Sequence, residues 1–149
     1  MLDPTEHPQV RDVRALTLPP GWHGWDLALA PPSPFDHLGY PVEPVRIVML
    51  DEGEVPYSNS APVRTYPRRS RDRSWKHKNE HPGDLCLWYP HDPPSQRWER
   101  TDGICEYIAI VQRHLLSEEA ARRNGGLWRG YEAPHGHPRE RPKVCRWNS

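Results

Sequence analysis

The sequence has few aliphatic residues, few cysteines and no long apolar run, so a large core, a disulfide framework and a membrane span are not expected. Only 26 of its 149 residues are Leu, Ile, Val or Phe, and its formal net charge is zero. Its three cysteines are odd in number and include no Cys-x-x-Cys pair, which excludes a disulfide scaffold and a zinc knuckle. No apolar run is long enough to span a membrane, and the first residues do not resemble a signal peptide. We therefore expect a reduced, cytoplasmic protein with no membrane partner, and the balanced charge argues against a nucleic-acid partner.

Aromatic and turn-forming residues are what the sequence has instead. Seven Trp and six Tyr provide bulky apolar area that the aliphatic count misses. Nineteen Pro and ten Gly predict long connections and little regular structure in the first half of the chain. The length predicts a single domain over residues 1–149, with a small, aromatic-rich core.

Three stretches in the first half have the patterns of strands and one has the pattern of a short helix. Residues 22–30 alternate in part, 45–50 are rich in β-branched residues, and 62–66 also read as extended. The spacing of the apolar residues in 10–18 predicts a brief helix, which Pro19-Pro20-Gly21 would end. These elements predict an α+β fold.

A long helix is expected to follow the sheet. Ile104, Ile108, Val111 and Leu115 recur at the spacing of one helical face, and Asn124-Gly125 is a typical helix stop. Ser117 is a candidate break that would divide this helix into two segments.

Cys86 is the candidate nucleophile. Lys76, His77, Lys78 and His81 precede it closely and His91 follows, and positive charge stabilises a thiolate. The alternative is a buried structural cysteine, because its sequence neighbours Leu85, Leu87 and Trp88 are apolar.

The other cysteines and the histidines allow different interpretations. Cys105 lies at the start of the expected helix, where core packing is favoured, and Cys145 lies in a polar tail. Zinc is a rival explanation for the cluster His77, His81, Cys86 and His91, but structural zinc sites usually combine a tight ligand pair with a second, distant pair. We expect no metal and no cofactor.

Residues 64–78 carry seven basic side chains and one acidic side chain. Such a run is commonly a solvated loop. Beside Cys86 it would also form an electropositive rim that receives an acidic partner tail, and nucleic-acid binding is a third interpretation.

The residues around Cys86 resemble the active-site segment of ubiquitin-conjugating enzymes. That family has a His-Pro-Asn motif, an Ile/Leu-Cys-Leu segment, a downstream Trp and then a helix. The chain has in this order His81-Pro82, Leu85-Cys86-Leu87 and Trp98, followed by the expected helix.

A closer resemblance is to the stand-alone bacterial branch found in CBASS anti-phage operons with a cGAS-like nucleotidyltransferase. Its members have a Leu-Cys-Leu-Tyr-Tyr-Pro-like run and a later Gly-x-Trp-x-Gly-x-Glu-x-x-His motif. The matching stretches here are 85–90 and 126–135, and the resemblance covers roughly residues 44–135.

The resemblance implies a ubiquitin-conjugating-enzyme-like fold, with a small antiparallel sheet, an active-site loop and C-terminal helices. It also implies a transferase in which Cys86 accepts the C-terminus of a cGAS-like nucleotidyltransferase as a thioester. A lysine of a target protein then attacks, and the transfer would prime anti-phage signalling. A thioester divides one difficult amide formation into two easier steps.

The chain departs from the family at one position, because Gly83 follows Pro82 where the family has Asn. The resemblance therefore leaves Asn79, His77 and His81 as the candidates to stabilise an oxyanion beside Cys86. The candidate partner-binding residues are Trp88, Arg69 and Arg71.

Other functions remain open on the sequence. A non-catalytic binding module of the same fold would hold the nucleotidyltransferase tail without transferring it. A small metal- or nucleic-acid-binding protein would use the histidine cluster and the basic run. The chain has no Gly-rich nucleotide loop, so an activated carboxylate would have to come from elsewhere.

Overall fold

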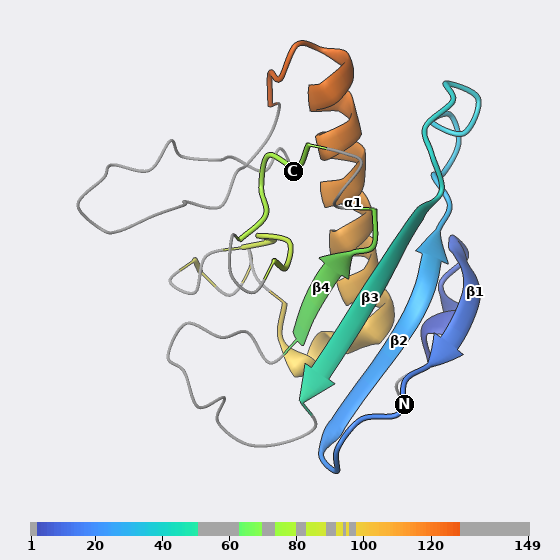
Figure 1. Ribbon diagram of the computed structural model, residues 1–149, viewed down its shortest axis with the longest axis vertical. Helices are drawn as coiled ribbons and strands as arrows, with labels where there is room; N and C mark the ends of the chain where they lie inside the picture. The colour runs from blue at the N-terminus through green and yellow to red at the C-terminus, as the bar shows by residue number, and fades with distance from the viewer. Residues whose placement is uncertain are drawn as a thin grey trace.

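The fold is α+β and consists of a four-stranded antiparallel sheet with one long helix against one of its faces (Figure 1). The computed structural model describes residues 3–50, 63–69, 74–79, 83–88, 92–93, 95 and 98–128. The elements are the 3-10 helix η1 (Pro4–Glu6), strands β1 (Val10–Ala15), β2 (Trp22–Leu29), β3 (Glu43–Leu50) and β4 (Val63–Pro67), the 3-10 helix η3 (Arg100–Asp102) and helix α1 (Gly103–Arg123).

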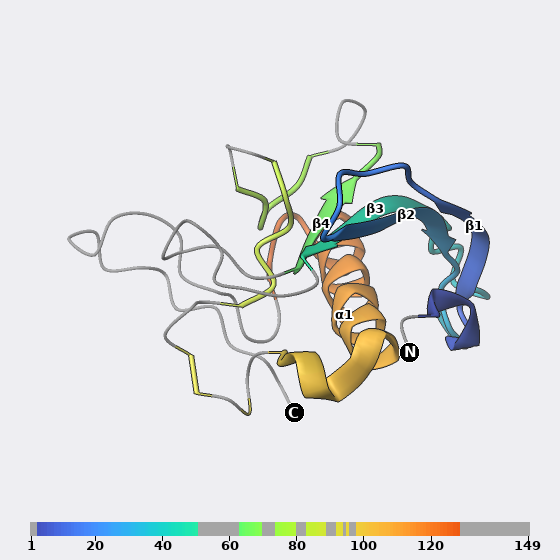
Figure 2. The ribbon, with the colours of Figure 1, turned by 90° about the horizontal axis from the view of Figure 1, so that it is seen from below.

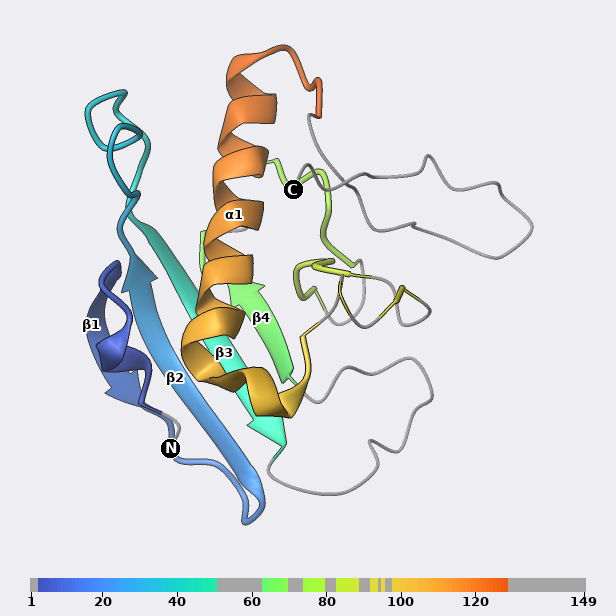
Figure 3. The same ribbon diagram turned by 180° about the vertical axis from the view of Figure 1, so that it is seen from behind.

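The strands lie in the order β1-β2-β3-β4, so each pairs with the next along the chain. Alternate side chains of β2, β3 and β4 are buried on the side that faces α1, as period-2 alternation requires. The sheet curves over the helix in Figure 2, and the view from behind in Figure 3 shows α1 lying in front of the sheet. The core therefore lies between one helix and one sheet face.

The predictions for three of the strands are confirmed. The stretch 22–30 contains β2, which ends at Leu29, and Trp25, Leu27 and Leu29 are all buried. The β-branched stretch forms β3, which begins at Glu43, two residues earlier than predicted, and residues 62–66 correspond to β4. These strands show clear alternation because one face packs on α1 and the other does not.

The predicted short helix at 10–18 is wrong, because this stretch contains strand β1. Its register shifts between Arg11 and Arg14, where a bulge places Asp12 at a φ of 53°. A bulge adds one residue to one strand, so Val10 and Val13 both pack on the core although three positions separate them. This spacing imitates a helical period, and pairing with β2 overrides the local pattern.

The predicted long helix is confirmed as α1, a single helix of 21 residues. Ile104, Ile108, Val111 and Leu115 are all buried, as the periodicity indicates. Ser117 does not break the helix, since its hydroxyl donates to the carbonyl of Arg113 at 3.0 Å within the helical turn. The helix ends at Arg123 with Gly125 and Gly126 at positive φ, so the predicted stop is also correct.

Side chains from the last turn of α1 make hydrogen bonds to two connections that are distant from each other in sequence. Arg123 donates to the carbonyls of Leu38 at 2.7 Å and Gly39 at 2.8 Å in the β2–β3 connection. Arg122 lies 4.5 Å from the ring of Trp75 and donates to the carbonyl of Ser74 at 2.9 Å. Both connections are therefore fixed to the same helical turn.

Of the C-terminal helices expected from the resemblance, α1 is the one found in the described residues, which end at Trp128. None of the helices in these residues combines the length and the apolar character that crossing a membrane requires.

Candidate functional site

Cys86 lies in a narrow antiparallel pair that extends the sheet beyond β4. The N–H of Asn79 donates to the carbonyl of Asp84 at 2.8 Å, and the N–H of Cys86 donates to the carbonyl of His77 at 2.9 Å. Between these bonds Lys78 is paired with Leu85. The N–H of Leu85 donates to the carbonyl of Thr65 in β4 at 2.8 Å. The Cys86 segment is therefore attached directly to the edge of the sheet.

The register of this pair brings three candidate residues together. His77 is opposite Cys86, and Asn79 is opposite Asp84. The amide of Asn79 donates to the carboxylate of Asp84 at 3.1 Å, as expected for side chains opposite each other. Of the residues predicted for the site, Cys86, His77 and Asn79 are thus neighbours in the structure, whereas His81 lies outside the described residues.

Gly83 occupies a backbone conformation that suits glycine. Its φ is 96°, a left-handed value that glycine adopts readily and that strains other residues. A side chain at this position would therefore strain the backbone, and the amide of Asn79 bonds Asp84, two residues before Cys86.

The environment of Cys86 favours the thiol over the thiolate. Burial raises its pKa to about 12, and the negative charges of Asp84 and Asp92 act in the same direction. A thiol with a pKa of about 12 is protonated at neutral pH, in contrast to the thiolate expected from the basic sequence neighbours.

His77 is held by packing and by its backbone. Its side chain is 4% exposed and lies edge-on to the ring of Trp128, with the ring centroids 4.2 Å apart. Its N–H donates to the buried carboxylate of Glu118 at 2.7 Å. His77 thus joins the Cys86 segment to α1.

The candidate partner-binding residues occupy different environments. Trp88 is half-buried and packs against the core, with its ring edge-on to that of Tyr107 at 6.0 Å. Arg69 is exposed in the turn after β4. Arg71 lies outside the described residues.

The described residues of the basic run 64–78 include both exposed side chains and a side chain that makes a hydrogen bond. Arg68 and Arg69 are exposed, whereas the ammonium of Lys76 donates to the carbonyl of Gly126. Arg71 and Arg73 lie outside the described residues, so the solvated loop and the partner-binding rim both remain interpretations.

Cys105 matches the prediction of core packing. It is half-buried at the start of α1 and packs against the core. Burial raises its pKa, and Glu6 and Asp3 act in the same direction. Cys145 lies outside the described residues.

Two residues of the site were missed in the sequence, Asp84 and Glu118. Asp84 lies two positions before Cys86, and this closeness in sequence is the signal that indicates it. Glu118 continues the buried stripe of α1, three residues after Leu115. A carboxylate on an otherwise apolar face is a signal of a buried polar site.

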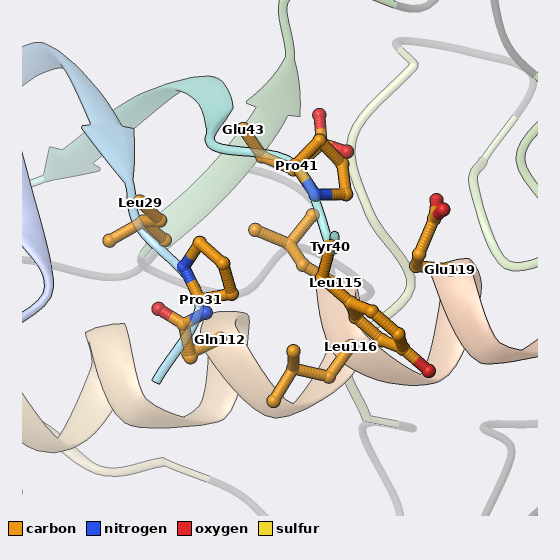
Figure 4. Close-up of a pocket in the computed structure, with 9 residues that line it drawn as sticks. All are labelled: Leu29, Pro31, Tyr40, Pro41, Glu43, Gln112, Leu115, Leu116 and Glu119. Atoms are coloured by element: carbon orange, nitrogen blue, oxygen red, sulfur yellow. The ribbon is translucent and has the colours of Figure 1, made fainter. Parts of the chain in front are cut away.

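A small cavity lies away from Cys86, between α1 and the β2–β3 connection (Figure 4). Tyr40 and Pro41 line it from the connection, and Gln112 and Leu115 line it from the helix. Its interior of about 10 Å³ has room for roughly one water molecule. The cavity is too small to serve as a substrate site.

Within the described residues no three His, Cys, Asp or Glu side chains are placed to hold one metal ion, and His81 and His91 lie outside them. No protein-family model, curated protein or solved structure matches the chain.

Proposed function

We propose that the protein is a ubiquitin-conjugating-enzyme-like acyl carrier that works through Cys86. The observation that carries this proposal is the position of Cys86 opposite His77, in a segment that is bonded to β4 through Leu85 and in which Asn79 bonds Asp84. The order of elements, an antiparallel sheet followed by the cysteine segment and then a helix, agrees with the fold that the sequence motifs imply.

The proposed reaction has two acyl transfers. The sulfur of Cys86 attacks the carbonyl carbon of an activated C-terminal carboxyl, presented as an acyl adenylate or a thioester, and the activating group leaves as the thiol proton is lost. A lysine amine of the target then attacks the Cys86 thioester, which forms an isopeptide bond and releases the sulfur, which takes up a proton. The donor implied by the motifs is the C-terminal tail of a cGAS-like nucleotidyltransferase.

Each transfer places a negative charge on the carbonyl oxygen. Asn79 is the candidate among the described side chains to stabilise this oxyanion, because its amide has a second N–H besides the one given to Asp84. Removing one such donor typically costs about 10²–10³ in rate. His77 supports the site by holding the Cys86 segment, because its N–H donates to Glu118 and its carbonyl accepts the N–H of Cys86. His81 keeps a supporting role in this proposal.

Because the pKa of Cys86 is raised to about 12, the protein without a bound donor holds this cysteine as an unreactive thiol. At neutral pH the thiol is protonated and protected from oxidation and alkylation. Docking of the donor tail therefore has to increase the exposure of Cys86 or neutralise Asp84 and Asp92. A basic side chain from the 64–78 run, or from the partner, would suit the second requirement.

A non-catalytic binding module is the second candidate function. The protonated state of Cys86 and the presence of Gly83 in place of the family's Asn favour it. In that case the same surface holds the nucleotidyltransferase tail, and Cys86 is structural.

Intact-mass analysis after co-expression with the nucleotidyltransferase of the same operon distinguishes the two functions. The wild-type protein is expected to carry a thiol-sensitive adduct, and Cys86→Ser is expected to carry a stable ester. Cys105→Ser is the matched control and should retain the thiol-sensitive adduct. Co-purification without an adduct in any of these proteins would reject the acyl-carrier function in favour of the binding module.

A further inference from the structure

A buried carboxylate on α1 holds the strand that lies next to Cys86. Glu118 is 1% exposed, and its two carboxylate oxygens accept hydrogen bonds from consecutive backbone N–H groups. The N–H of Lys76 donates to one oxygen at 2.9 Å, and the N–H of His77 donates to the other at 2.7 Å. A carboxylate that receives two backbone N–H bonds fixes the chain at that point.

Glu118 remains charged in this buried position. Burial acts to raise its pKa, but the nearby imidazole of His114 and the hydrogen bonds from the backbone N–H groups of Lys76 and His77 outweigh this effect, so its pKa is lowered. The Nε2 atom of His114 lies 3.4 Å from Glu118, and His114 is itself 3% exposed. A buried carboxylate lowers the stability of the folded protein unless it keeps its hydrogen bonds.

The contacts continue from Glu118 to Cys86. His77 receives the N–H of Cys86 on its carbonyl at 2.9 Å, and Lys78 pairs with Leu85. On its other side, Leu85 is bonded to Thr65 in β4. The Cys86 segment is therefore held between the sheet edge and a strand that Glu118 fixes to α1.

We propose that Glu118 is a positioning residue for Cys86, acting through the backbone of residues 76–77 to hold the thiol in its covered position. Its relevance to acyl transfer rests on the proposed function, whereas its effect on the exposure of Cys86 does not. Glu118 touches neither Cys86 nor the proposed acyl donor, and its influence is entirely through the strand pair.

The chain offers a chemically matched control in the next residue. Glu119 is also buried, at 8% exposed, and its carboxylate bonds the guanidinium groups of Arg122 at 2.9 Å and Arg123 at 3.0 Å. Glu118→Gln has nearly the shape of Glu but presents one oxygen and one NH₂ group, so it can accept from only one of the two N–H groups. Glu119→Gln makes the same chemical change without altering the carboxylate that holds residues 76–77.

The test is the rate at which iodoacetamide alkylates Cys86 relative to Cys105, measured by peptide mass spectrometry from pH 7 to pH 9. In Glu118→Gln the ratio is expected to rise at least about tenfold, because a released Cys86 segment regains thiolate at lower pH. The pH dependence of Cys86 labelling should shift to lower pH in the same variant. In Glu119→Gln the ratio should stay within about twofold of the wild-type value.

An unchanged ratio in Glu118→Gln would overturn the proposal, and so would an equal rise for both thiols, which would indicate a general loss of stability. Amide hydrogen exchange of the wild-type protein gives a second test that needs no variant. The amides of Lys76, His77 and Cys86 should exchange as one protected group. Rapid exchange at Lys76 and His77 with protection at Cys86 would reject the role of Glu118. Neither measurement uses an acyl donor, so failure to form a thioester leaves both results unaffected.

Discussion

The hydroxyl oxygens of Tyr107 and Thr65 lie 2.7 Å apart in a hydrogen bond that joins α1 to β4. Both residues are 0% exposed, and burial raises the pKa of Tyr107. The same Thr65 accepts the N–H of Leu85 on its carbonyl. Thr65 is thus the residue at which the sheet meets both the helix and the Cys86 segment.

Replacing either hydroxyl of this pair should destabilise the protein. Tyr107→Phe or Thr65→Val leaves one buried hydroxyl without its partner, and we expect each to lower the free energy of unfolding by about 1–3 kcal/mol. In the double variant no hydroxyl is left unpaired, so its loss should be smaller than the sum of the two. Urea unfolding of the four proteins measures the coupling. Simple additivity would contradict a direct bond between these groups.

Cys86 should react slowly in the resting protein. With its pKa at about 12, the thiolate fraction at pH 8 is far below that of an unperturbed thiol. We expect iodoacetamide to alkylate it at least about tenfold more slowly in the native protein than in urea. Asp92→Asn should accelerate native labelling, because it removes a charge that raises this pKa. Native labelling as fast as that of the unfolded chain would contradict the covered, protonated state.

Asp26 should make the stability depend on acid pH. Its pKa is lowered to about 2, mainly by the hydrogen bond from Arg46, and further by Arg14 and Arg68. Because the folded pKa is below the ordinary value of 3.8, the contribution is complete above that value and is lost as the pH falls toward about 2.

Asp26→Asn is therefore expected to lower the free energy of unfolding by about 1 kcal/mol at pH 7, with the difference from wild type vanishing near pH 2. Urea unfolding between pH 2 and pH 7 tests this, with the more exposed Asp36→Asn as the control. A difference that persisted unchanged at the lowest pH would show that the charge of Asp26 is not its cause.

Gly24 should not tolerate a side chain. A Cβ at this position would lie 2.8 Å from Cδ1 of Leu18 and 2.9 Å from the carbonyl oxygen of Ile47. We expect Gly24→Ala to lower the free energy of unfolding by about 1–3 kcal/mol. Adding Leu18→Ala should restore only part of the loss, because the clash with the backbone of Ile47 remains. Complete recovery in the double variant, measured against Leu18→Ala alone, would place the whole clash at the leucine.

Much of the fold could be predicted because the elements obey simple periods. β2, β3 and β4 have one face on α1, so their alternation is visible in the sequence. The bulge at Asp12 breaks that alternation in β1, and no local pattern distinguishes the resulting spacing from a helical one.

The site could be predicted only as far as it is local in sequence. The turn at Gly83 returns the chain, so His77, Asn79 and Cys86 come together within ten residues of each other. The contact of Glu118 with residues 76–77 spans about 40 positions and depends on how α1 packs. The raised pKa of Cys86 could not be predicted for a related reason, because its largest cause is burial, which depends on how the segment packs.

The attachment of Leu85 to β4 has a consequence for the solubility of the protein. A sheet has two edges, and each open edge is a template for pairing with another chain. On one side, β1 is interrupted by its bulge and carries exposed Arg11, Asp12 and Arg14. On the other side, the Cys86 segment occupies a hydrogen-bonding position of β4. Any variant that detaches this segment is therefore expected to expose a pairing edge, and to aggregate in proportion to the time the segment spends released.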